Sequence, residues 1–270
     1  AERSRIGEER FRREHECEFL IFDETLISSI TLADMEGVSP VETTGQVRWF
    51  KRPTPGHTYL VSLDPSMGTG GDYAAIQVFE LPTFEQVGEW HHNQTPMNQQ
   101  IRILQGINKH IHDTIMEKDS TATPQIFYSM ENNTIGEAAL MRVMDIGEEN
   151  IVGMFLSEPI RKGHRRKFRR GFNTTAKHKI DACTKFKELV EGGKMKINSQ
   201  LLISEMKDFV ASGLSYKAKP GQHDDLVSSC LLMTRMMKVL ADFDPKIFEK
   251  WTDRTSELTT PMPIFGNFYG

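Results

Sequence analysis

Strand-like and helix-like patterns of apolar residues follow one another along most of the chain. Apolar runs of strand length occupy residues 57–64, 73–81, 86–93, 124–131 and 150–157. Apolar residues spaced three and four positions apart, as in an amphipathic helix, occupy residues 97–116, 136–146, 176–191, 199–210 and 224–240. Three strands in succession, then strand–helix–strand, then helices predict an α/β fold with a mixed sheet flanked by helices.

A glycine-rich segment, PSMGTGGD at residues 65–72, joins the first two predicted strands. It does not match GxxxxGK[ST], the phosphate-binding loop of P-loop NTPases, and a strand rather than a helix follows it. We therefore interpret it as the turn of a β-hairpin. No Walker A sequence occurs elsewhere, so the chain carries no recognisable ATPase.

Composition narrows the possible partners. The net charge of the 270 residues is −4, so any contact with nucleic acid must come from a local basic surface. The three cysteines lack CxxC spacing, which argues against a disulfide framework or a cysteine zinc site and favours an intracellular setting. No apolar run reaches the length of about 18 residues that a membrane span needs, and we expect no membrane partner.

Four carboxylates stand at element ends that a sheet of this kind would bring together. Asp64 ends the first predicted strand, Glu131 ends the fourth, and Asp224 and Asp225 open the last helix. If the two strands are parallel neighbours, their acids lie side by side at the edge where open α/β sheets place their sites. Clustered carboxylates without basic partners repel one another, and bound Mg²⁺ or Mn²⁺ would relieve this. The pattern predicts a two-metal centre for phosphodiester hydrolysis.

Simpler roles remain open for the same residues. Asp224 and Asp225 could merely cap their helix, because aspartate accepts free amide hydrogens at a helix start. Successive helical residues point about 100° apart, so we expect one of the pair to face the site squarely. Asp72 is either a further metal ligand or part of the turn chemistry. His223 could position a water or a phosphate.

One segment is strongly basic although the whole chain is acidic. Residues 161–179 contain nine lysines and arginines, two interleaved phenylalanines and no acid. We interpret the segment as a loop that contacts the DNA backbone, the alternative being a solvated loop with no partner. The predicted DNA-binding residues are Arg161, Lys162, Arg165, Arg166, Lys167, Arg169, Arg170, Lys177 and Lys179.

Several of these motifs together resemble one known family. They are LDPSMGTGGDYAAIQVFE, YSMENNTIGEAAL, GFNTTAKHKIDACTKFKELVEGGKMKI and GQHDDLVSSCLL. As a set they resemble the nuclease domain of the large terminase subunit of tailed bacteriophages, over residues 57–240. The early sequence RFRREHECEFL is similar to the segment that follows the terminase motor domain.

The resemblance implies an RNase H-like fold and a metal-dependent endonuclease that cuts concatemeric double-stranded viral DNA. It assigns the family's acidic triad to Asp64, Glu131 and one of the two adjacent aspartates, with Asp225 favoured and Asp224 assisting. The implied partners are viral DNA, the portal and prohead, the small terminase subunit and an ATPase domain of the full-length protein. The implied location is the cytoplasm of an infected bacterium.

We therefore expect three segments. Residues 1–56 are a linker that follows an absent ATPase motor domain, 57–242 the RNase H-like nuclease domain, and 243–270 a C-terminal tail. Two alternatives stay open: an RNase H-like resolvase or transposase-type nuclease, and a non-catalytic module that docks DNA or the portal.

Overall fold

A seven-stranded mixed sheet forms the centre of the computed structural model, which describes residues 25–159 and 170–243. The strand order is β1-β2-β5-β4-β3-β6-β7. β6 runs parallel to β3 and to β7, and the other neighbouring pairs are antiparallel. The strands are β1 (Glu42–Thr44), β2 (Val47–Trp49), β3 (Thr58–Asp64), β4 (Ala74–Leu81), β5 (Glu85–His92), β6 (Gln125–Met130) and β7 (Met154–Phe155).

The hairpin predicted around the glycine-rich segment is present between β3 and β4. The two strands pair in antiparallel register from Thr58↔Leu81 to Asp64↔Ala75. Gly68 in the connection has φ +69°, and a Cβ built there would lie 2.2 Å from the Thr95 carbonyl oxygen. Only glycine meets both demands, so this residue fixes how closely the connection packs on the end of β5.

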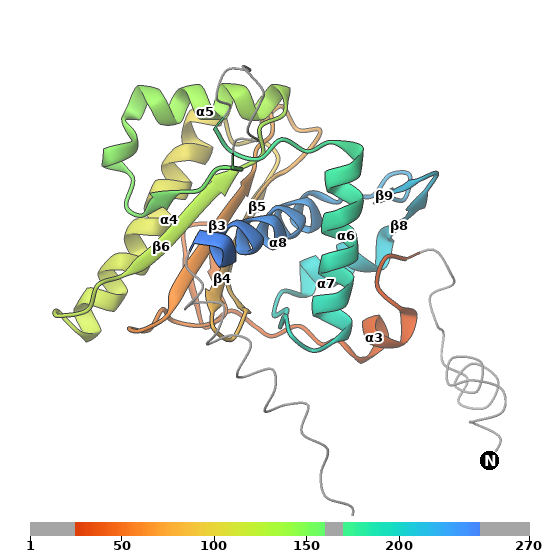
Figure 1. The fold of residues 1–270 in the computed structure, drawn as a ribbon, viewed down its shortest axis with the longest axis horizontal. Coiled ribbons are helices and arrows are strands. Elements are labelled where there is room, and N and C mark those ends of the chain that lie inside the picture. The colour runs from red at the N-terminus through yellow and green to blue at the C-terminus, as the bar shows by residue number, and fades with distance from the viewer. Residues whose placement is uncertain (1–24, 160–169, 244–270) are drawn as a thin grey trace, which may run out of the picture.

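Helices cover both faces of the sheet, as the apolar pattern predicts (Figure 1). α4 (Met97–Lys118) and α5 (Thr134–Ile146) bury one face in a core that contains Tyr59 and Val61. α6 (Ala176–Glu191), α7 (Gln200–Asp208) and α8 (Asp225–Phe243) bury the opposite face in a core that contains Leu60. Alternate residues of β3 therefore serve the two cores, which explains its continuous apolar sequence. In the part of the chain that the structure describes, no helix is long and apolar enough to span a membrane.

Some short elements differ from the predicted ones. The predicted helix 199–210 ends at Asp208, and Phe209 instead begins the hairpin of β8 (Phe209–Ser212) and β9 (Ser215–Ala218). The predicted strand 150–157 keeps only the two residues of β7, after a 3₁₀ turn at Glu148–Asn150. A short helix, α3 (Ser29–Asp34), also precedes β1.

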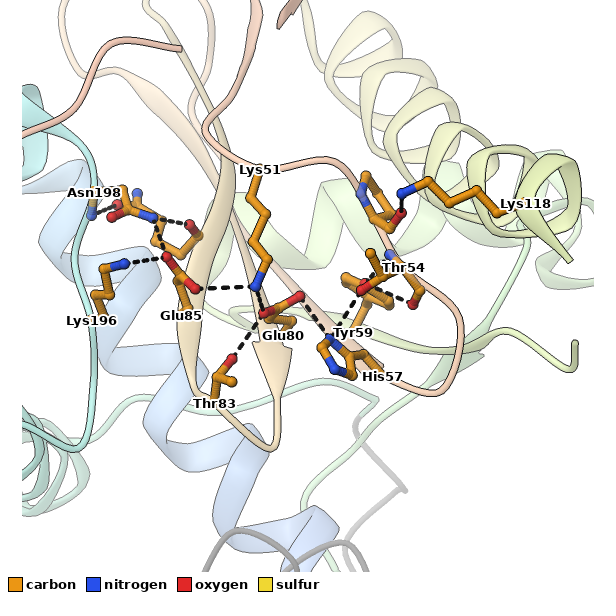
Figure 2. A network of polar contacts seen from close by, with 12 residues as sticks. Lys51, Thr54, His57, Tyr59, Glu80, Thr83, Glu85, Lys118, Lys196 and Asn198 are labelled. Carbon is orange, nitrogen blue, oxygen red and sulfur yellow. Dashed lines mark hydrogen bonds and ion pairs between the residues drawn. The ribbon is translucent and has the colours of Figure 1, made fainter. Parts of the chain in front are cut away.

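Part of the predicted linker contributes to the sheet. β1 and β2 lie before residue 57, where we placed the start of the nuclease domain, and β2 pairs with β5. A polar network ties this segment to the far end of β4 (Figure 2). In it, the buried Glu80 carboxylate accepts hydrogen bonds from Lys51 and from Thr83 and lies 3.0 Å from His57 Nδ1. In the described residues the sheet thus starts earlier than the sequence boundary.

Candidate metal centre

Asp64 and Glu131 lie side by side because β3 and β6 are parallel neighbours, as predicted. The register pairs Leu63 with Met130, which places the next residue of each chain at the same edge. The amide of Glu131 donates to the Leu63 carbonyl at 3.4 Å. Asn133 Nδ2 donates to Glu131 Oε2 at 3.0 Å and so orients that carboxylate. The parallel ladder therefore presents both acids from its carboxyl end.

The N-terminus of α8 brings the adjacent aspartates to the same edge. α8 packs across β3 and β4. Near its start, Ser229 and Ser62 are fully buried and hydrogen-bond through their hydroxyls at 2.8 Å. Ser62 lies two residues before Asp64, and Ser229 lies four residues after Asp225. This buried pair fixes the first turn of the helix relative to the strand that ends in Asp64.

Tyr73 and His223 flank the Asp225 carboxylate. The Tyr73 amide donates to Asp225 Oδ2 at 3.3 Å, and His223 Nδ1 lies 3.7 Å from the same oxygen. The Tyr73 ring stacks on His91, with 4.1 Å between ring centroids, and meets His223 edge-on at 4.8 Å. Asp72 is exposed beside this cluster, and its charge contributes to the raised pKa of Asp225.

The electrostatics show that these carboxylates share one environment. Burial raises the pKa of Asp64 well above its usual range, and the charges of Glu131, Asp225 and Asp224 raise it further, against Lys179. Burial also raises the pKa of Asp225 to about 6; the Tyr73 amide opposes this shift, while the Asp224 charge adds to it. Keeping all of them ionised without a nearby cation is therefore costly.

The donor set suits a hard divalent cation. Carboxylate oxygens are the ligands that Mg²⁺ and Mn²⁺ prefer, and mutual repulsion of the acids is what such an ion would remove. Within residues 25–159 and 170–243, no three His, Cys, Asp or Glu side chains already surround one point at ligand distance.

A pocket beside Asp64 and Glu131 has a basic wall, of which the motif analysis predicted only Lys179. His178, Lys179 and Arg235 line it together with Thr174. Arg235 donates to Thr174 Oγ1 at 2.8 Å and forms an ion pair with Glu158. Arg235 lies in an ordinary amphipathic helix, so nothing in its sequence context marks it. His178 lies in the basic segment 161–179, of which only the lysines and arginines were predicted to bind DNA. The site edge therefore carries both acids and bases.

The predicted basic segment is divided by the structure. Arg161, Lys162, Arg165, Arg166, Lys167 and Arg169 lie outside the described residues. Arg170 is ion-paired with Glu148, and Lys177 is exposed on the first turn of α6. Lys179 Nζ lies 3.9 Å from Asp224 Oδ2, so the expectation of carboxylates without basic partners is wrong at this position.

Glu205 is a further acid beside the site that the sequence analysis did not identify. It comes from α7, and its side chain is 11% exposed. Its Oε2 accepts the amides of Leu226 and Val227 at 2.9 and 3.2 Å, and its Oε1 lies 3.6 Å from His91 Nε2. Burial raises its pKa to about 9, although the two amides oppose the shift.

The sequence of the sheet and of these helices matches a known family. Residues 61–236 fit the sequence model of the terminase RNase H-like domain. The chain belongs to this family. The match spans the two strands with Asp64 and Glu131 and the start of α8, and it confirms the resemblance to terminase nuclease domains that the motifs indicate.

Solved structures with the same fold are also terminase nuclease domains. The large terminase nuclease of thermophilic phage G20c, with bound magnesium, is 17% identical; the match covers 79% of this chain and 98% of that one, with a TM-score of 0.58. The nuclease domain of Thermus phage P74-26 is 18% identical, with 75% and 90% covered and a TM-score of 0.53. The human cytomegalovirus terminase nuclease domain, manganese-soaked and inhibitor-bound, is 14% identical, with 83% and 98% covered and a TM-score of 0.50. These likenesses confirm the predicted RNase H-like fold.

Proposed function

We propose that this terminase RNase H-like domain is a metal-dependent endodeoxyribonuclease that cuts double-stranded viral DNA during packaging. The observation that carries the proposal is the convergence of acids from β3, β6 and α8 on one sheet edge, where burial, and then the charges of the neighbouring acids, raise the pKa of Asp64. Structural relatives with this fold were solved with bound magnesium or after manganese soaking. Divalent ions supply two functions in phosphodiester hydrolysis: they lower the pKa of water and stabilise the leaving oxygen.

Each carboxylate has a role that follows from its place. The charge of Asp64 interacts with those of Glu131, Asp225 and Asp224, so Asp64 would be the central acid of a metal site. Glu131, oriented by Asn133, would contribute a ligand from β6, and Asp225 with Asp224 would contribute ligands from α8. Asp72, on the exposed rim, is an outer acid that acts through Asp225 or through water.

The basic side chains complement these acids. Lys179 is 28% exposed and lies between the Asp224 carboxylate and the pocket, where it can bind a phosphate oxygen of the DNA. The other basic residues of 161–179 would contact DNA phosphates. Because phosphates are the same at every base pair, we expect cutting with little sequence preference. In the full-length protein, the ATPase domain, small subunit and portal would deliver the DNA in the infected cell.

Nicking of supercoiled plasmid tests the proposal. The wild-type chain is incubated with Mg²⁺, Mn²⁺ or EDTA, beside Asp64→Asn and Glu131→Gln, which keep side-chain shape and remove charge. Asp145→Asn is the matched control, because Asp145 is an exposed acid paired with Arg142 away from the site. We expect the wild type and the control to cut the plasmid only when Mg²⁺ or Mn²⁺ is present. In both site variants the cutting rate should fall by at least about 100-fold.

The outcomes also separate the alternatives. Cutting confined to branched DNA would favour a resolvase-type nuclease. Unimpaired cutting by Asp64→Asn or Glu131→Gln would refute the assignment of the site. If both this chain and the full-length protein bind DNA without metal and never cut it, the domain is a non-catalytic docking module.

A further inference from the structure

The N-terminus of α8 is capped by an unexpected residue. The Asp224 carbonyl accepts the Ser228 amide at 2.7 Å, which places Asp224 at the N-cap position. An N-cap aspartate ordinarily accepts the amide of the second or third helical residue, here Leu226 or Val227. Both amides instead donate to Glu205 Oε2 of α7. The cap that the sequence pattern predicts is thus supplied from a neighbouring helix.

The Asp224 carboxylate has a different neighbour. Its Oδ2 lies 3.9 Å from Lys179 Nζ, and its charge acts on Asp64 across the site. If Asp224 capped its own helix, its oxygen would turn back toward the amides of Leu226 and Val227. Occupation of those amides by Glu205 therefore coincides with an Asp224 carboxylate at the acidic edge.

We propose that Glu205 is a positioning residue of the nuclease site, which caps α8 in place of Asp224 and so releases Asp224 to face Asp64. The inference rests on the proposed function, because it concerns carboxylates that would hold the metal. In this proposal Glu205 acts through its hydrogen bonds to the two helix amides and not as a metal ligand.

Removal of the Glu205 oxygen should change the start of α8 in a specific way. Leu226 and Val227 would lose their buried acceptor, and an unsatisfied buried amide is costly. Asp224 is the nearest group able to accept them, since its chain position is that of an N-cap. Its return to the helix would take one carboxylate away from the metal centre.

Binding of Mn²⁺ to the purified chain, measured by isothermal titration calorimetry without DNA, tests this. Glu205→Gln keeps an oxygen acceptor, whereas Glu205→Met has similar length and none. We expect Glu205→Gln to bind Mn²⁺ as the wild type does, and Glu205→Met to bind about 10- to 100-fold more weakly, the usual effect of losing a residue that supports metal ligands. Equal affinity of the Gln and Met variants would overturn the inference.

A double-mutant cycle separates positioning from a general loss of structure. Asp224→Ala should weaken Mn²⁺ binding in the wild type and add little in the Glu205→Met background, because Asp224 has already left the site there. If the two substitutions weaken Mn²⁺ binding independently, so that their fold-changes multiply in the double variant, the inference is overturned. If Glu205→Met does not fold by circular dichroism, the melting temperature of Asp224→Ala in EDTA decides. An unchanged or higher value supports the inference, and a lower value identifies Asp224 as the cap and refutes it.

Failure of the proposed function gives a different result. In that case the wild type binds no Mn²⁺, or Asp64→Asn binds it equally well, and both proposals fall. If Asp64 is required for binding while Glu205→Met behaves like Glu205→Gln, the nuclease assignment stands and the role of Glu205 alone is refuted.

Discussion

Replacement of Asp225 by asparagine should stabilise the metal-free domain at neutral pH. The carboxyl is 15% exposed, and its pKa is raised to about 6 from an ordinary value of 3.8. A shift of about two pKa units corresponds to about 3 kcal/mol. Asparagine keeps an oxygen for the Tyr73 amide and carries no charge, so the variant avoids the cost of ionisation.

The pH dependence has a definite sign. The folded state holds the Asp225 proton more tightly than the unfolded state, so this group favours folding at low pH. Its contribution declines as the pH rises above 3.8 and is fully lost above about 6. The stability gain of Asp225→Asn over wild type should therefore be near zero at pH 4 and reach its full value near pH 7.

Thermal melting in EDTA, followed by fluorescence from pH 4 to 8, measures this difference. For a domain of about 200 residues, about 3 kcal/mol corresponds to roughly 6–12 °C in melting temperature, as an upper limit. With Mn²⁺ the order should reverse, because an ion that binds the folded state stabilises the wild type alone. An Asp225→Asn variant that melts below wild type in EDTA at pH 7 would refute the electrostatic argument.

Three further predictions concern residues around the site. Lys179→Met should raise KM for plasmid DNA about tenfold or more in steady-state nicking assays, because a phosphate partner is lost; an unchanged KM would place Lys179 outside the DNA path. Ser229→Ala should lower the free energy of unfolding in urea by about 0.5–1.5 kcal/mol, since Ser62 Oγ loses the Ser229 hydroxyl but keeps the Ser229 carbonyl as acceptor; an unchanged free energy would show that the hydroxyl pair does not hold the helix on the strand. The binding constant K for DNA should fall less steeply with salt when four basic residues are neutralised. The magnitude of the slope of log K against log salt should drop by about 3 rather than 4, because one of the four, Arg170, already pairs with Glu148. An unchanged slope would mean that the segment faces away from DNA. The four residues are Arg165, Arg166, Arg169 and Arg170.

The sequence predicts the centre of the sheet well because burial on both faces leaves a clear signal. β3 and β4 are continuous apolar runs, so both strands could be placed from the sequence. The parallel pairing of β3 with β6 is only a condition of the sequence argument, and the structure meets it. That pairing places Asp64 beside Glu131.

The parts that the sequence does not reveal depend on contacts between distant residues. Glu205 lies in an ordinary amphipathic helix, and its role arises from amides 21 and 22 positions away. β1 and β2 have three residues each, too few to show a period. The helix predicted over 199–210 stops at Asp208 because Phe209 pairs with Ala218 instead, a contact that apolar spacing cannot encode.

The two ends of β4 deal with buried negative charge in opposite ways. At the end near the β4–β5 turn, Glu80 is matched by Lys51 and His57 from the same chain (Figure 2). At the other end, Ala75 pairs with Asp64, whose neighbours are mainly other acids. The charge at one end is thus balanced within the chain, whereas the other end would be balanced by ions from solution if the acids bind metal as proposed. Removal of divalent ions should accelerate hydrogen exchange at the Asp64 end while the Glu80 end keeps its protection, so a single sheet can report its ionic surroundings locally.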